Sequence, residues 1–205
     1  MIQPEAYLSR RAIHLISILN SNDTISIRNA PLMIKSFLSS SKYDHTTYSY
    51  ISINLIINSD PSGENDGFDD TELEALITLN VRILRYNMSG YNLSKMISKC
   101  NLDFEGEMDL VILLSPNIMI LESFTYIWIK QSPAVVYIPQ RGTQYCGCKL
   151  SIMNKAAYEK ISLSPEYQTI ESICEHLFSN SPDALLFDGI QFKYCLLYTS
   201  PSPRD

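Results

Sequence analysis

The chain has 205 residues, of which 45% are hydrophobic and 19% are charged, and this composition is typical of a soluble globular protein. Its formal net charge of −6 at pH 7 argues against a nucleic-acid partner, which would favour a basic face. No apolar run approaches the ~18 residues that span a bilayer, so the sequence predicts no membrane segment.

Four cysteines precede residue 195, and we expect them to be free buried thiols. The closest pair, Cys146 and Cys148, has one residue between its members, whereas the first ligands of a zinc site are usually separated by two. No second pair follows. Free thiols fit a reducing compartment, so a cytoplasmic location is expected. The four are Cys100, Cys146, Cys148 and Cys174.

The first half of the chain alternates between predicted strands and helices. Apolar, β-branched runs predict strands at 12–20, 48–58, 80–86 and 109–114. Helical spacing of apolar residues predicts helices at 27–41, 69–79 and 90–102. We expect Pro31 near the start of the first helix and Asp70 or Thr71 as the N-cap of the second.

The second half continues with shorter elements. An amphipathic helix is predicted at 120–131, a strand at 134–140, a strand-like run at 146–154 and a helix at 155–161. A short helix at 169–179 and a strand or pair of strands at 183–194 follow.

Strands that alternate with helices predict an α/β fold with an open, mostly parallel sheet. In such sheets ligands bind outside the carboxyl ends of the strands. The predicted strands end in short polar residues, which are Asn20, Asn58-Ser59-Asp60, Asn87 and Ser115-Pro116-Asn117. These residues are therefore the first candidates for a binding site.

The order of motifs between about residues 12 and 194 resembles the GT-A fold of nucleotide-sugar-dependent glycosyltransferases, most closely the large family-two group. That resemblance implies a Rossmann-like sheet flanked by helices. "SILN" keeps Asn20 at the end of the first strand, and "IINSDPSGEND" has Asn58 where an Asp is commonest, with Asp60 two residues on. "YNMSGYNLSKM" supplies Asn87, Gly90 and Asn92 after the third strand. The order and spacing of these matches, rather than any one of them, support the resemblance.

The fourth strand departs from the family pattern. "LLSPN" stands where the family has Asp-x-Asp or Asn-Pro-Asp, so the acidic motif is degenerate. Further along, "TIESICEHL" places Glu171 where the family has its catalytic base. The alternative interpretation of Glu171 is a solvated acid in the first turn of a helix.

The resemblance implies transfer of a sugar from a nucleotide sugar to a hydroxyl of a glycan, lipid or protein acceptor. Glu171 would be the catalytic base. The residues expected to bind the nucleotide sugar are Asn20, Asn58, Asp60, Gly90, Ser115 and Asn117. Turn formation is the alternative role for Asp60, which precedes Pro61, and for Gly90.

The family's Mg²⁺ or Mn²⁺ would have only a weak ligand in Asn117, because Ser115 and Asn117 supply neutral oxygens. Three accounts stay open. A side-chain cation such as Lys95 or Arg141 could replace the metal, or other acids such as Glu122 or Asp60 could hold it. Alternatively, the domain has lost catalysis and binds a nucleotide sugar, a glycan or a partner protein. An unrelated nucleotide-binding α/β domain is a further hypothesis.

The remaining prominent side chains are expected to be structural. His14 lies within an apolar strand, His176 lies on a helix, and Trp128 is expected to pack between helix and sheet, with stacking on an acceptor as its alternative. "CLLYTSPSPRD" at 195–205 resembles the translation of a transposase adapter used in sequencing libraries. We therefore expect one natural domain at 1–194, truncated at its C-terminus, where a membrane anchor could follow.

Overall fold

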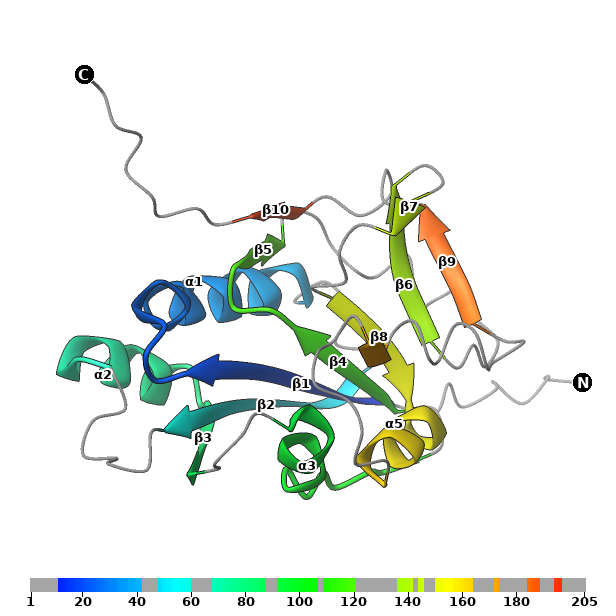
Figure 1. The fold of residues 1–205 in the computed structure, drawn as a ribbon, viewed down its shortest axis with the longest axis horizontal. Coiled ribbons are helices and arrows are strands. Elements are labelled where there is room, and N and C mark those ends of the chain that lie inside the picture. Colours follow the sequence, from blue (N-terminus) through cyan, green and yellow to red (C-terminus); the bar gives the residue numbers. More distant parts are fainter. Residues whose placement is uncertain are drawn as a thin grey trace, which may run out of the picture.

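The computed structural model describes residues 11–41, 48–59, 68–87, 92–106, 109–120, 136–141, 144–145, 150–163, 172–173, 184–188 and 194–196. These residues form an α/β structure in which helices cover both faces of a central sheet (Figure 1). The predicted fold class is confirmed. No helix within these ranges has the length and apolar character needed to cross a membrane.

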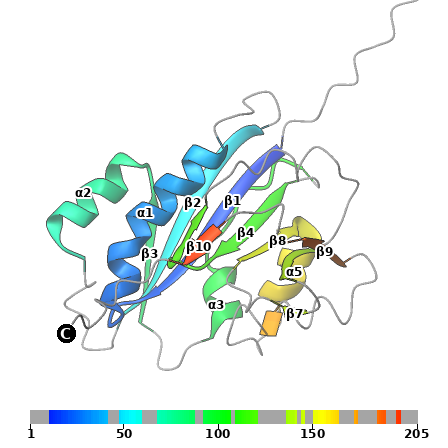
Figure 2. The same ribbon diagram turned by 90° about the horizontal axis from the view of Figure 1, so that it is seen from above.

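The central sheet has the strand order β3-β2-β1-β4-β8-β6-β7, and β9 pairs with β6. β1, β2, β3 and β4 run parallel, whereas β8 is antiparallel to β4 and to β6 (Figure 2). The four predicted strands of the first half are thus confirmed as neighbours. Their bounds are β1 (Arg11–Asn20), β2 (Tyr48–Ser59), β3 (Arg82–Asn87) and β4 (Leu110–Leu114).

The strands of the second half are shorter. They are β6 (Val136–Arg141), β7 (Gln144–Tyr145), β8 (Leu150–Asn154) and β9 (Ala184–Asp188). β5 (Ile118–Ile120) leaves the central sheet and pairs antiparallel with β10 (Tyr194–Leu196) in a separate two-stranded sheet. β10 includes Cys195 and Leu196, the first two residues of the stretch that resembles an adapter translation.

The described helices divide between the two faces of the sheet (Figure 1). α1 (Thr24–Ser41) and α2 (Asp70–Thr78) cover one face, and α3 (Leu93–Ser98) and α5 (Lys155–Ser162) cover the other. We call these the α1/α2 face and the α3/α5 face. Of the helix predicted at 169–179, only Ser172 and Ile173 are described, and both are helical.

Helix starts differ from the sequence predictions in three places. α1 begins at Thr24, three residues before the predicted start, so Pro31 lies inside the helix rather than near its start. α2 is capped by Asp69 rather than by Asp70 or Thr71, because Asp69 and Glu72 form a reciprocal capping box. α3 begins after Asn92, whose side chain accepts a hydrogen bond from Lys95 N at 3.0 Å.

The core follows the period-two alternation of the strands. Ile13, Leu15 and Leu19 of β1 belong to the cluster under α1 and α2, whereas Ile16 belongs to the cluster under α3 and α5. All five residues of β4 are buried because both faces of this central strand are covered. Cys100 is a buried free thiol, as predicted. Cys146, Cys148 and Cys174 lie outside the described residues, as do His176 and Trp128.

Asp109 fixes the start of β4. Its carboxylate is fully buried and accepts hydrogen bonds from the backbone N–H groups of Ala12 at 2.9 Å, Glu105 at 2.6 Å and Gly106 at 3.0 Å. Three N–H donors compensate the loss of hydration of a buried carboxylate. Asp109 therefore ties the loop before β4 to the amino end of β1.

Candidate functional site

Two asparagines lie side by side at the carboxyl ends of β1 and β2. Asn20 and Asn58 are register partners in the parallel pair, and Asn58 Nδ2 donates to Asn20 Oδ1 at 3.5 Å. Asn20 is exposed and Asn58 is half-buried. Asn58 Oδ1 is buried and accepts no hydrogen bond within the described part of the chain. The strand order thus creates a polar pair from residues that are 38 positions apart.

The polar step after β4 is a corner at which the chain changes sheets. Leu114 and Ile118 on either side of it are buried, and Ile118 N donates to Ser115 O at 3.2 Å across the turn. Asn117 N lies 3.5 Å from Ser115 Oγ, which is a weak bond. The apolar run stops here because the chain leaves β4 and turns into β5.

The Asn117 amide is hydrogen-bonded to α1 on both sides. Asn29 Nδ2 donates to Asn117 Oδ1 at 2.9 Å, and Asn117 Nδ2 donates to Ser26 Oγ at 3.0 Å. Ser26 Oγ in turn donates to Asp23 Oδ2 at 2.5 Å, and Ser26 N donates to Asp23 Oδ1 at 3.1 Å. The β4–β5 corner is therefore connected to the first two turns of α1.

Asp23 connects this network to the asparagine pair. Asp23 N donates to Asn20 O at 2.9 Å, and Asp23 O accepts the first helical bond, from Ile27 N at 3.0 Å. Asp23 is thus the N-cap of α1. Asn20, Asn58 and Asn117 consequently lie along one edge of the sheet, as the sequence analysis expected of residues at strand ends.

Asp23, Ser26 and Asn29 were not among the residues predicted for the site. The predicted helix began at Ile27, so Asp23 and Ser26 fell outside it, and Asn29 had the pattern of an ordinary helix residue. One signal was available, because Asp is a preferred N-cap residue and Asp23 immediately precedes the helical segment.

Lys95 is the first described cation after the third strand end. β3 ends at Asn87, which is the register partner of Ser59, and α3 follows with the exposed Lys95 in its first turn. In a parallel α/β sheet the helix that follows a strand starts at the carboxyl edge. This places Lys95 close to the edge that carries Asn58.

Several predicted site residues lie outside the described residues. These are Asp60, Gly90, Glu122 and Glu171. Arg141 is the last residue of β6, and its side chain is not described. Ile173, two residues after Glu171, is buried in the core of the α3/α5 face.

The described side chains at this edge do not fit a divalent cation. Mg²⁺ and Mn²⁺ favour carboxylate oxygens, and Asp23 carries the one carboxylate of the network. Both of its oxygens accept hydrogen bonds from Ser26, and Asn117 Oδ1 accepts one from Asn29. Within the described ranges no group of three or more His, Cys, Asp or Glu residues lies close enough to hold a metal.

No protein-family model and no curated protein matches the chain. Solved structures do. TarS of S. aureus matches with a TM-score of 0.56 at 11% identity, over 92% of this chain and 37% of TarS. The inositol-1-phosphate CTP transferase of T. maritima matches with a TM-score of 0.54 at 10% identity, over 91% of this chain and 89% of that protein. HddC from Yersinia pseudotuberculosis matches with a TM-score of 0.51 at 8% identity, over 89% of this chain and 92% of HddC.

The fold is GT-A-like. The matched structures are GT-A-type glycosyltransferases and nucleotidyltransferases, and identities this low show the fold alone. The architecture inferred from the motif order is thus confirmed. In this GT-A-like sheet the asparagine pair and the β4–β5 corner occupy the carboxyl edge, where ligands bind in open α/β sheets.

Proposed function

We propose that the chain binds a nucleotide sugar at the carboxyl edge of β1, β2 and β4 and transfers its sugar to a hydroxyl acceptor. One observation supports the proposal above the others. The Asn20–Asn58 pair is connected through Asp23 and Ser26 to Asn117, so polar residues of three separate segments share this edge.

The asparagine pair suits the nucleoside part of the donor. An amide offers both N–H donors and a carbonyl acceptor, as do the edges of a nucleobase, while a ribose hydroxyl can donate or accept. Asn58 Oδ1 is buried without a donor within the described part of the chain, and a bound nucleoside would supply one. Asn20 is exposed next to it and is available to the same ligand.

The transfer step needs a charge partner for the leaving group and a base for the acceptor. A bond forms between the acceptor oxygen and the anomeric carbon, while the bond from that carbon to the phosphate oxygen breaks. The nucleoside diphosphate leaves with the electron pair, and the acceptor proton passes to the carboxylate of Glu171. Lys95 would offset the negative charge on the diphosphate, because the described carboxylates do not fit a metal.

The second candidate is a GT-A-like domain that binds a nucleotide sugar, glycan or protein partner without turnover. One observation favours it. The amide of Asn117, which stands in the place of the family's acidic motif, is hydrogen-bonded to α1 through both its oxygen and its nitrogen.

Donor binding is tested by thermal unfolding with UDP-, GDP-, CDP- and dTDP-sugars, each in EDTA and in added Mg²⁺ or Mn²⁺. A donor at a hundredfold excess over its Kd should add ~2.7 kcal/mol to the free energy of unfolding. Asn58→Ala should remove most of this gain, whereas Glu74→Gln, an exposed change on α2, should keep it. If no nucleotide sugar stabilises the chain, both candidate functions lose their support.

Turnover separates the two candidates. Release of the nucleoside diphosphate should depend on the acceptor and should be lost in Glu171→Gln, with donor binding retained. Glu175→Gln, one helical turn further along the sequence, is the matched control and should keep turnover. Donor binding without turnover in the wild-type chain would favour the binding domain. Consumption of a nucleoside triphosphate and a sugar phosphate would instead indicate a nucleotidyltransferase.

A further inference from the structure

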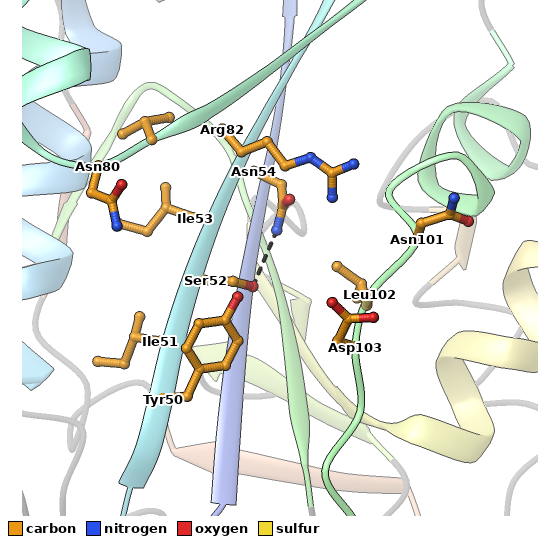
Figure 3. A pocket seen from close by; sticks show the side chains of 11 residues that line it. Tyr50, Ile51, Ser52, Ile53, Asn54, Asn80, Arg82, Asn101, Leu102 and Asp103 are labelled. Atoms are coloured by element: carbon orange, nitrogen blue, oxygen red, sulfur yellow. Dashed lines mark hydrogen bonds between the residues drawn. The ribbon is translucent and has the colours of Figure 1, made fainter.

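A cavity lies at the amino end of the parallel strands, away from the carboxyl edge. It has a volume of about 240 Å³ and is lined by three segments, Tyr50–Asn54 of β2, Asn80–Arg82 and Asn101–Asp103 (Figure 3). Ser52 precedes Asn58 by six residues, which is roughly 20 Å of strand at ~3.3 Å per residue. The cavity is therefore separate from the proposed donor site.

The cavity exists because β3 begins later than β2. Asn54 is the first residue of β2 that pairs with β3, opposite Arg82, whereas Tyr50 to Ile53 pair only with β1. The described residues thus leave one edge of this part of β2 open. Backbone N–H and C=O groups on an open strand edge are available to a ligand.

The lining combines an aromatic ring with polar groups. Tyr50, Ser52 and Asn54 follow one another along β2, and Asp103 and Leu102 face this row (Figure 3). The side chain of Tyr50 is 45% exposed. Arg82 extends from the start of β3 on the same side and donates through Nη1 to Cys100 O at 2.9 Å.

A polar row of His14, Ser52 and Asn54 borders the cavity, and Ser52 is half-buried. His14 is fully buried, and its Nδ1 is hydrogen-bonded with Ser52 Oγ at 2.7 Å. Asn54 is 2% exposed and donates to Ser52 Oγ at 3.3 Å and to Leu15 O at 3.4 Å. Both bonds use its Nδ2, and no described residue donates to its Oδ1. His14 Nε2 also lacks a partner within the described ranges. Asn54 and Ser52 line the cavity, so a ligand there can bond Asn54 Oδ1 and extend this network.

The charge balance of the lining indicates a neutral ligand. Arg82 and Asp103 supply one positive and one negative group, and they form no ion pair with each other. The other polar groups are amides and hydroxyls, which can each donate and accept, as a sugar hydroxyl does. The exposed ring of Tyr50 can pack against the C–H face of a sugar ring.

The size of the cavity limits the ligand to one ring. A volume of about 240 Å³ lies below the ~300–1,000 Å³ of pockets that hold drug-sized ligands. Asn80 and Asn101 flank the opening, each with a positive φ, of 55° and 43° respectively. Asn tolerates this conformation where α2 and α3 end, and no described residue bonds either side-chain amide.

From this geometry we infer that the cavity is a second carbohydrate site, which binds a single neutral pyranose unit, with Tyr50 stacking on the ring and Asn54 and Asp103 bonding its hydroxyls. The site does not depend on the proposed donor edge. A chain with two such sites would hold a glycan at a distance from the point of transfer.

Isothermal titration and saturation-transfer NMR with D-glucose, D-galactose, D-mannose and N-acetyl-D-glucosamine test the inference on the full chain. We expect at least one sugar to bind with a Kd in the ~1–10 mM range, which corresponds to about −4 to −3 kcal/mol. Tyr50→Ala and Asp103→Ala should each weaken this binding at least about tenfold. Tyr50→Phe keeps the ring and should bind within about threefold of wild type.

Two controls separate this site from the donor edge. Asn58→Ala should leave monosaccharide binding unchanged, and Tyr50→Ala should leave nucleotide-sugar binding unchanged. The inference is overturned if no sugar in the panel binds the wild-type chain, or if binding survives in both Tyr50→Ala and Asp103→Ala. Loss of binding in Asn58→Ala alone would assign the sugar to the donor edge and would also overturn it. Because Tyr50 and Asp103 are exposed, both variants should fold, and circular dichroism checks this.

Discussion

The two faces of the sheet use the same strands but differ in polarity at the amino ends of β1 and β2. On the α1/α2 face, Ile13 and Ile53 belong to an apolar cluster. On the α3/α5 face, their neighbours His14, Ser52 and Asn54 form a polar row in which His14 and Asn54 are buried. His14 and Asn54 are as buried as Ile13 and Ile53, yet only the α1/α2 cluster is apolar here. Burial alone therefore does not determine which residue types a strand carries.

The difference indicates that the α3/α5 face is not optimised for stability. Three polar side chains replace apolar ones, and the buried His14 Nε2 has no partner among the described residues. Asp109 shows that this chain can satisfy a buried polar group fully, with three N–H donors. Natural sequences depart from good packing mainly where a function needs it, and the polar row borders the inferred carbohydrate site.

The largest effect should come from the apolar face. Phe37 of α1 is fully buried in the cluster with β1, β2 and β4, so Phe37→Ala should lower the free energy of unfolding by about 3–5 kcal/mol. Urea denaturation measures the loss. Leu38→Ala, at a half-buried neighbour, should lose less than half as much. A loss of less than ~1 kcal/mol for Phe37→Ala would mean that α1 does not pack as described.

The next largest loss of stability should come from changing Asp109, whose buried carboxylate is hydrogen-bonded. Asp109→Ala leaves three backbone N–H groups without an acceptor, and it should cost ~3 kcal/mol in the same assay. Asp103→Ala removes an exposed acid and should change stability by less than ~0.5 kcal/mol. If both variants lost the same amount of stability, Asp109 could not be distinguished as the structural acid from Asp103 as the ligand-binding acid.

The polar row should respond differently to partial and complete replacement. Ser52→Ala leaves His14 Nδ1 and Asn54 Nδ2 short of a partner and should cost about 1–3 kcal/mol. Replacing the whole row, by His14→Leu, Ser52→Ala and Asn54→Leu together, should bring stability back to within ~1 kcal/mol of wild type. The triple variant should no longer bind a monosaccharide. A large loss of stability in the triple variant would show that the row is structural.

The smallest effect is a pH dependence. Burial lowers the pKa of His14, and the nearby acids Asp109, Asp103 and Glu105 oppose this shift without cancelling it. The unfolded chain takes up the proton near pH ~6.5, before the folded chain does, so stability falls as the pH drops below this value. Lowering the pH from about 7.5 to about 5 should therefore destabilise the wild type relative to His14→Leu. An unchanged difference would mean that the His14 pKa is not lowered.

Local sequence patterns predicted the strands because β1, β2 and β4 are buried on both faces and read as continuous apolar runs. The start of α1 was misplaced because Pro31 is a helix breaker at interior positions, where it costs ~3 kcal/mol, and a start near Pro31 avoids that cost. The structure places it inside the helix, where it is buried. Tertiary packing therefore overrode a local preference.

The candidate sites were only partly predictable. Strand ends located Asn20, Asn58 and Asn117, because parallel strands bring their carboxyl ends to one edge. The cavity was not predictable, since it depends on where β3 begins to pair and not on any motif. His14 was expected to be structural, and its bond to Ser52 requires a register that a single sequence does not give.

The hydroxyl of Ser36 attaches α1 to β5, because it accepts a hydrogen bond from Ile120 N at 3.0 Å. Together with the bonds of Ser26 and Asn29 to Asn117, this attaches α1 to the corner and to β5 along about three helical turns. The two segments should consequently move together as one rigid unit. A molecule that displaces the corner would therefore also change the position of Ser36, although it does not touch that residue.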